Sequence, residues 1–176
     1  MSFLLSHSKG QTPLDPDSAQ GLIPSHIATQ ALLNAAEQAN IISAKEWLLN
    51  KKADALDRDF LFELHHRMFC DVWKWAGKQR LLETSIGVDP LNVSSELKKL
   101  VDDASYWIDR KTYSWDEIGA RFHHRLVWIH LFPNGNGRHA RLATDYLLST
   151  NGQPVFSWGE QNDLARDNYL AALRAA

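Results

Sequence analysis

The chain has 176 residues, 44% of them hydrophobic and 23% charged, which suits one globular domain and differs from the composition of a disordered chain. Its 21 acidic and 19 basic residues give a formal net charge of -2, which argues against binding nucleic acid or an anionic membrane by bulk charge. A single cysteine, Cys70, excludes an internal disulfide. No window approaches the roughly 20 apolar residues that span a bilayer, and no basic lead-in marks a secretory signal. The sequence therefore predicts a soluble, cytoplasmic protein.

Residues 1–24 carry three prolines among turn-forming side chains, which predicts an N-terminal arm rather than a regular element. A helix is expected over residues 25–40, where apolar residues recur at helical spacing. The buried stripe that this spacing indicates consists of Ile27, Ala31, Leu32, Ala35 and Ala39. Ser43 to Glu46 has the spacing of a capping box and predicts the start of a second, shorter helix.

A third helix is predicted around residues 56–68, where an apolar residue recurs at every fourth position. From Leu82 to Val88, apolar or β-branched residues alternate with polar or small ones, and this period of two predicts a short strand or hairpin arm. Asp89 and Pro90 then cap and open the next helix, whose apolar stripe runs to Ile108.

Ser114 to Glu117 is another capping-box match, and its helix should end near His130 because a proline and two glycines follow. A further helix is predicted from Asn136 to Ser149, ended by Asn151 and Gly152. Ser157 to Glu160 predicts the start of a last helix. These elements predict an all-α, bundle-like domain with one small β-element.

The segment from His130 to Arg141 concentrates the side chains that can do chemistry. A helix is predicted to end at an imidazole, a Gly-Asn-Gly turn follows, and the next helix opens with Arg138 and Arg141. The N–H groups at a helix N-terminus form an anion site. Two arginines there oppose the helix dipole by ~0.3–1 kcal/mol each unless an anion lies between them. Phosphate suits the arginine fork, and His130 can then act as a base beside it.

Each of these residues also has an ordinary structural explanation. Asn-Gly turns are common between helices, an arginine near a turn is usually a solvated charge, and a lone histidine is more often a core or surface residue. For His139, which follows Arg138, surface exposure is the default expectation. The combination is much rarer than its parts, so the pattern favours a phosphate-binding loop with a base.

The segment resembles the signature of the Fic domain family, His-x-Phe-x-(Asp/Glu)-Gly-Asn-Gly-Arg-x-x-Arg. It reads His130-Leu131-Phe132-Pro133-Asn134-Gly135-Asn136-Gly137-Arg138-His139-Ala140-Arg141, so that every fixed position matches except the acidic one. Residues 75–80 resemble the family's lead into its flap hairpin, and residues 167–173 resemble its closing helix. Residues 10–24 are similar to a bacterial Fic subfamily called mobile mystery protein B.

The resemblance implies a Fic-type helical bundle with a small β-hairpin flap. Its parts are an N-terminal arm at 1–24, N-terminal helices at 25–55 and a Fic core domain at 56–176. By this resemblance the protein is a protein adenylyltransferase-like enzyme, in which His130 deprotonates a Ser, Thr or Tyr hydroxyl of a target protein. The hydroxyl then attacks the α-phosphate of a nucleotide, and AMP is transferred from ATP.

The resemblance also assigns the residues that bind the nucleotide and the target. The α- and β-phosphates are cradled by Gly135, Asn136 and Gly137, the β-phosphate is held by Arg138, and the terminal phosphate is reached by Arg141. The strand through Thr84 and Ile86 corresponds to the flap, where a target segment docks by adding a strand. Tyr169 lines the base pocket by the same resemblance.

Some family members inhibit themselves with a helix whose glutamate pairs with the second arginine of the signature, here Arg141. Glu37 is the best candidate for that glutamate, although Leu33 and Gln38 depart from the family's pattern around it. The alternative interpretation of Glu37 is a solvated carboxylate on a helix surface.

Asn134 stands where the family usually has an Asp or Glu that helps to hold Mg²⁺. A neutral amide oxygen can coordinate the ion but brings no charge. We therefore expect Mg²⁺ to bind more weakly, to rely on the nucleotide's phosphates or to be dispensable. Alternatively, the donor is a molecule other than ATP. The alternative function is a nucleotide-binding regulatory or toxin–antitoxin module with an antitoxin partner. Neither nucleic acid nor a membrane is an expected partner.

Overall fold

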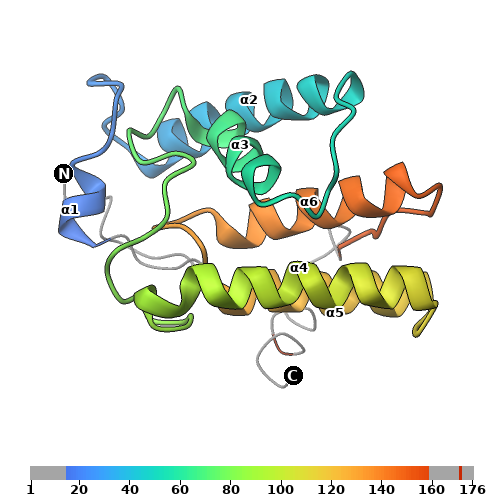
Figure 1. Ribbon diagram of the computed structural model, residues 1–176. Helices are drawn as coiled ribbons and strands as arrows, with labels where there is room; N and C mark the ends of the chain where they lie inside the picture. The colour runs from blue at the N-terminus through green and yellow to red at the C-terminus, as the bar shows by residue number, and fades with distance from the viewer. Residues whose placement is uncertain (1–14, 159–170, 172–176) are drawn as a thin grey trace.

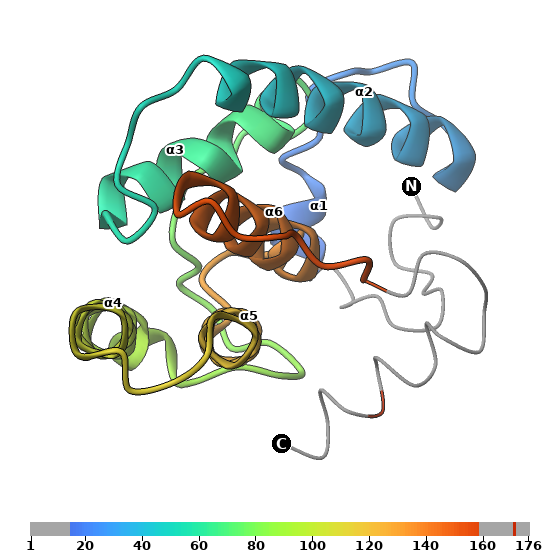
Figure 2. The same cartoon turned by 90° about the vertical axis from the view of Figure 1, so that its right-hand side faces the viewer.

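The computed structural model describes residues 15–158 and residue 171, and this part of the chain is all-α, as predicted. One helix, α6, lies between two helix pairs (Figure 2). The five long helices are α2 (Gln30–Leu49) with α3 (Arg58–Phe69), α4 (Val93–Arg110) with α5 (Trp115–Ile129), and α6 (Asn136–Thr150) (Figure 1). All five contribute side chains to one buried hydrophobic cluster. None of the described helices has the length and apolar character to cross a membrane.

The predicted caps at two of the helix starts are confirmed. The Asp89 carboxylate accepts the N–H of Leu91 at 2.8 Å and opens the short 3-10 helix η2 (Pro90–Asn92), which leads into α4. The Ser114 hydroxyl accepts the N–H of Glu117 at the start of α5. Because these side chains satisfy otherwise unpaired N–H groups, they fix where the helices begin. The helix predicted from Ser157 onward lies almost entirely outside the described residues.

The two helices predicted between residues 25 and 49 are one continuous helix, so this prediction is wrong. The Ser43 hydroxyl donates to the carbonyl of Ala39 one turn earlier, so it lies inside the helix and caps nothing. Of the predicted buried stripe, Ile27 is confirmed as buried, but the rest is wrong, since Leu32 is half-exposed and the three alanines of the stripe are exposed. The buried face consists of Leu33, Glu37, Asn40, Ile41, Ala44 and Leu48.

The N-terminal arm contains one short helix that the sequence did not predict, α1 (Pro16–Ala19), capped by the side chain of Asp15. Its C-terminal side is tied to the segment after α3. The Trp75 indole donates to the Ser18 carbonyl, and Leu22 forms an isolated antiparallel bridge with Trp73. The arm is therefore joined to the segment that follows α3.

Residues 81–88 form an irregular loop, and the described part of the chain contains no β-hairpin, which corrects the predicted flap strand. The alternating pattern does not produce a buried face, because Leu82 and Ile86 are each 51% exposed. The carbonyls of Leu82 and Val88 accept from the Arg80 guanidinium, and the carbonyl of Ile86 accepts from the Thr84 hydroxyl. These carbonyls are the groups that strand pairing would use.

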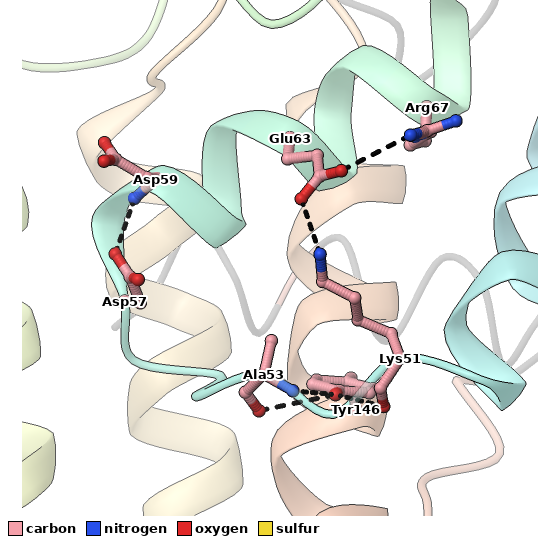
Figure 3. A network of polar contacts seen from close by, with 7 residues as sticks. All are labelled: Lys51, Ala53, Asp57, Asp59, Glu63, Arg67 and Tyr146. Carbon is pink, nitrogen blue, oxygen red and sulfur yellow. Dashed lines mark hydrogen bonds and ion pairs between the residues drawn. The ribbon is translucent and has the colours of Figure 1, made fainter.

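A polar network fixes the connection between α2 and α3 against α6 (Figure 3). The Tyr146 hydroxyl on α6 donates to the carbonyl of Lys51 at 2.9 Å and accepts the N–H of Ala53 at 3.1 Å. The Lys51 ammonium pairs with Glu63 at 3.0 Å and lowers the pKa of that carboxyl. This network sets the position of α2 relative to α6, which matters because both helices contribute to the site described next.

Candidate active site

The α5–α6 loop, residues 130–135, joins the end of one helix to the start of the next. Gly135 precedes α6 with φ 77°, and a Cβ there would lie 2.7 Å from the Phe69 ring, so both the backbone and the packing require glycine. Among the described residues no side chain caps α6, whose first N–H groups also lack intrahelical partners. A Cβ at Gly137 would meet no atom of residues 15–158 within 4 Å. These residues therefore leave the N-terminus of α6 open on this side, as an anion site requires.

Asn136 braces this loop from within. Its amide oxygen accepts the N–H of Phe132 at 2.9 Å, and its amide nitrogen donates to the Phe132 carbonyl at 2.7 Å. Both residues are buried. The Asn136 side chain thus closes the loop, and only its backbone N–H is placed to contact an anion at the helix N-terminus.

Two buried histidines, His65 on α3 and His139 on α6, pack beneath the α5–α6 loop on the side of the core. The His65 ring stacks on Phe132 with centroids 3.6 Å apart, and its Nδ1 accepts the N–H of Gly77. The proton of the neutral ring is therefore on Nε2, which donates to the carbonyl of Asn134 at 3.1 Å. His139 donates to the carbonyl of Leu61 and is 1% exposed, so the prediction of surface exposure is wrong. Burial lowers the pKa of both histidines, which keeps them neutral.

His65 was not predicted as a site residue, although its spacing on α3 carries a signal for it. It lies four residues after Leu61 and four before Phe69, and both of these are fully buried on α3. A histidine at that spacing belongs to the buried face of its helix. Its polar atoms then need partners within the protein, which the loop and Gly77 supply.

His130 follows α5 in the left-handed conformation, with φ 57° and ψ 66°. Its Nδ1 donates to the carbonyl of Val127 at 3.2 Å, so Nε2 is the basic nitrogen of the neutral ring. The side chain is 2% exposed, and burial together with the nearby Arg80 charge lowers the pKa of His130 to about 4. A Cβ at Gly87 would lie 2.7 Å from the His130 Cβ, which places the 81–88 loop directly against this residue.

Glu37 reaches the same site from α2. Its carboxylate accepts from Arg138 Nη1 at 2.6 Å and from the Trp73 indole at 2.7 Å. The glutamate is 5% exposed, so the interpretation of it as a solvated carboxylate is wrong. The Arg138 guanidinium also lies over the Phe69 ring, 4.8 Å from its centroid. The arginine that Glu37 contacts is the first of the loop signature rather than Arg141.

A model of the Fic/DOC family matches residues 55–148, which is more than half of the chain. The chain belongs to the Fic/DOC family. It is 34% identical over 137 residues to protein adenylyltransferase fic-1 of Caenorhabditis elegans, which covers 73% of this chain and 26% of that protein. Protein adenylyltransferase Fic of Nematostella vectensis is 28% identical over 110 residues, covering 60% and 26%. The chain spans about a quarter of the length of these curated relatives.

Solved Fic structures share the fold. Fic-1 of C. elegans superposes with a TM-score of 0.68 at 24% identity, covering 89% of this chain and 47% of that one. BepC of Bartonella tribocorum, solved with bound AMPPNP, gives a TM-score of 0.66 at 15% identity and covers 88% of both chains. The all-α Fic-type fold of this chain is therefore established.

At the Fic signature position Asn134, this chain offers Mg²⁺ an amide in place of a carboxylate. The amide oxygen is neutral and accepts the N–H of Gly135 at 2.7 Å. The described residues contain no group of three or more His, Cys, Asp or Glu side chains able to hold a metal ion. Mg²⁺ prefers carboxylate oxygens and retained waters, so these residues do not fit the ion.

Of the remaining predicted site residues of this Fic domain, the structure describes three and leaves one outside the described residues. Thr84 and Ile86 lie in the irregular 81–88 loop, with the Thr84 hydroxyl donating to the Ile86 carbonyl at 2.5 Å. Arg141 lies in α6 one turn after Gly137 and is partly buried. Tyr169 lies outside the described residues.

Proposed function

We propose that this Fic domain transfers AMP from ATP onto a Ser, Thr or Tyr hydroxyl of a target protein. The observation that supports this most is the α5–α6 loop, which brings the basic nitrogen of His130 and the open N-terminus of α6 into one short segment. The relatives named as protein adenylyltransferases and the AMPPNP bound to BepC support ATP as the donor. Gly135, Asn136 and Gly137 bind the α- and β-phosphates through backbone N–H groups.

The proposed step is a displacement at the α-phosphorus. His130 Nε2 takes the proton of the target hydroxyl as its oxygen forms a bond to the α-phosphorus. The bond from that phosphorus to the oxygen bridging to the β-phosphate breaks, and pyrophosphate leaves. Arg138 and Arg141 neutralise the charge on the β- and terminal phosphates. Positioning and charge neutralisation are the main contributions of the protein to such reactions.

Labelling with α-labelled nucleotides tests this function. We would incubate the purified chain with a bacterial lysate and α-labelled ATP, GTP, CTP or UTP. We expect label on protein with ATP, no label for His130→Ala, and normal label for His26→Ala, since His26 is an exposed histidine. Absence of label with all four nucleotides, for the wild type and for Glu37→Gln, would contradict the proposal.

Glu37 is the proposed inhibitory residue. Its carboxylate already binds Arg138, the side chain proposed to hold the β-phosphate, so the nucleotide has to compete with it. Glu37→Gln keeps the size and removes the charge. We expect labelling to rise about tenfold, which corresponds to 1.4 kcal/mol, whereas Glu46→Gln, an exposed glutamate on the same helix, leaves it unchanged. Equal labelling by the wild type and Glu37→Gln would remove Glu37 from this role.

Asn134 bears on the identity of the donor. Asn134→Asp supplies the charge that Mg²⁺ prefers, so we expect faster transfer from ATP with Mg²⁺ and no gain without it. A loss of transfer in both conditions would indicate that Asn134 is adapted to another donor.

A second candidate is a nucleotide-binding regulatory or toxin–antitoxin module with little catalytic activity. The burial of His130 and the neutral Asn134 favour it. Its partner would be an antitoxin rather than a modified target. Retained ATP affinity with an unaltered cellular phenotype in His130→Ala would support it. Membership of the mobile mystery protein B subfamily and a cytoplasmic location are parts of either proposal.

A further inference from the structure

Arg80 is a buried arginine, 2% exposed, that binds the end of α5. Its Nε donates to the carbonyl of His130 at 2.5 Å, and its Nη2 lies 3.4 Å from the carbonyl of Ile129. The backbone N–H of Arg80 donates to the carbonyl of Leu131 at 3.0 Å. A cation at a helix C-terminus is favourable because the last carbonyls lack partners. Arg80 therefore fixes the backbone on both sides of the His130 side chain.

The same guanidinium also holds the 81–88 loop, which lies against His130. Nη1 donates to the carbonyl of Leu82 at 2.9 Å, and Nη2 donates to the carbonyl of Val88. Between these two residues lies Gly87, whose Cβ position is 2.7 Å from His130 Cβ and 2.9 Å from Arg80 Nη2. One side chain thus makes two sets of bonds, one to α5 and one to the 81–88 loop.

The positive charge of Arg80 is not matched by a carboxylate in contact. The described residues give it no ion pair, and Glu83 and Asp89 act on it only at longer range. Its partners are neutral carbonyls. The loop carbonyls can separate from the guanidinium more easily than a buried carboxylate could, because no second charge has to be separated from it.

We propose that Arg80 is a positioning residue for His130 and holds the 81–88 loop closed over it. On opening, the bonds to Leu82 and Val88 break while the bonds to Ile129 and His130 remain, so the imidazole is uncovered without losing its position. This role rests on the proposed function of His130 as the base. It extends that function by naming what places the base and what covers it.

The test is the titration of the His130 ring by NMR in the full chain. Arg80→Lys keeps a charge but has no planar fork, so the loop is released and water reaches the ring. We expect the pKa of His130 to rise by about one unit or more as desolvation is relieved, while the titration of His139 stays unchanged. Arg121→Lys, an exposed arginine on α5, is the control. Unchanged His130 titration in folded Arg80→Lys would overturn the proposal.

A second variant keeps the test decisive if Arg80→Lys does not fold. Gly87→Ala leaves Arg80 in place but forces the loop away from His130, because its Cβ has no room and its φ of 122° disfavours a side chain. We expect the pKa of His130 to rise while the Nε–H of Arg80 stays protected from exchange, because the bond to His130 persists. Loss of that protection would show that the two sets of bonds break together and would overturn the proposal.

The activity readout separates this inference from the function on which it rests. If the chain is a transferase, Arg80→Lys lowers kcat about tenfold or more and leaves the KM for ATP nearly unchanged, because the hydrogen bonds of Arg80 go to residues 129–131 and to the 81–88 loop rather than to residues 135–137. A KM effect of the same size as the kcat effect would contradict a positioning role. If no variant transfers a nucleotide but the His130 titrations shift as expected, the proposed function fails and the positioning role stands.

Discussion

The α5–α6 loop and the 81–88 loop lie against each other at His130, but they are held by different kinds of contact. Inside the α5–α6 loop, Asn136 pairs with both backbone groups of Phe132, and His65 binds the Asn134 carbonyl from below. All of these contacts except the last are fully buried. Several independent bonds and a stacked ring therefore have to fail before this loop can change shape.

The 81–88 loop depends mainly on Arg80. In this loop Leu81 is 84% exposed and Leu82 and Ile86 are each 51% exposed, so Val88 is its one apolar side chain that packs against the core. Under the proposed function, the two loops have different requirements. The loop that binds phosphates needs a fixed geometry, whereas the loop that covers His130 has to move before a target hydroxyl can reach it.

Acid should protonate the buried histidines, of which His65 and His139 support the α5–α6 loop, and this should have the largest effect on stability. The pKa of His123, His130 and His139 is about 4 in the folded protein and about 6.5 when unfolded, because burial disfavours the charged ring. The unfolded chain therefore binds more protons below pH 6.5, and stability is lost as the pH falls from 6.5 towards 4. At pH 5 the loss is about 2 kcal/mol for each histidine.

Urea unfolding at pH 7.5 and pH 5.0 measures this loss. His139→Gln is the matched variant, since its amide can still donate to the Leu61 carbonyl but does not titrate. Because burial also lowers the pKa of His65, four histidines contribute, and we expect the pH dependence of the free energy of unfolding to be about one quarter smaller in His139→Gln. A free energy of unfolding that is the same at both pH values would contradict the neutral buried state of these rings.

Removing the internal brace of the first loop should have the next largest effect. Asn136→Leu leaves the buried N–H and C=O of Phe132 without partners, at about 1–3 kcal/mol each. We expect the free energy of unfolding to fall by about 2–5 kcal/mol, measured by denaturant unfolding. Asn34→Ala, an exposed asparagine on α2, should change it by less than about 0.5 kcal/mol. Equal effects of the two variants would show that Asn136 does not brace the loop.

Features that depend on residues close together in the sequence could be predicted from it. Helix starts such as Ser114 and Asp89 were predictable because a cap acts within three residues of itself. The motif from His130 to Arg141 was found because its residues are contiguous. The buried face of α2 was missed because alanine is compatible with either face of a helix, and because Glu37 and Asn40 are polar although buried.

Residues that hydrogen-bond to backbone groups far away in the sequence produce no pattern in it. Arg80 binds carbonyls 49 and 50 positions away, and no local spacing reports such a contact. The alternation from Leu82 to Val88 predicted a strand because the rule assumes a partner and a buried side. Here a single guanidinium takes the carbonyls instead, which only the three-dimensional structure reveals.

The smallest effect on stability, and the sharpest test of the second loop, is expected at Ile86. Its side chain is half-exposed, so Ile86→Ser should change the free energy of unfolding by less than about 0.5 kcal/mol. If a target segment docks on the 81–88 loop, labelling of the target falls several-fold while ATP binding by calorimetry stays the same. Leu91→Ser removes a side chain that is 90% exposed but lies outside this loop, so it should leave labelling intact. Equal losses at both positions would mean that exposed apolar surface in general, rather than this loop, recruits the target.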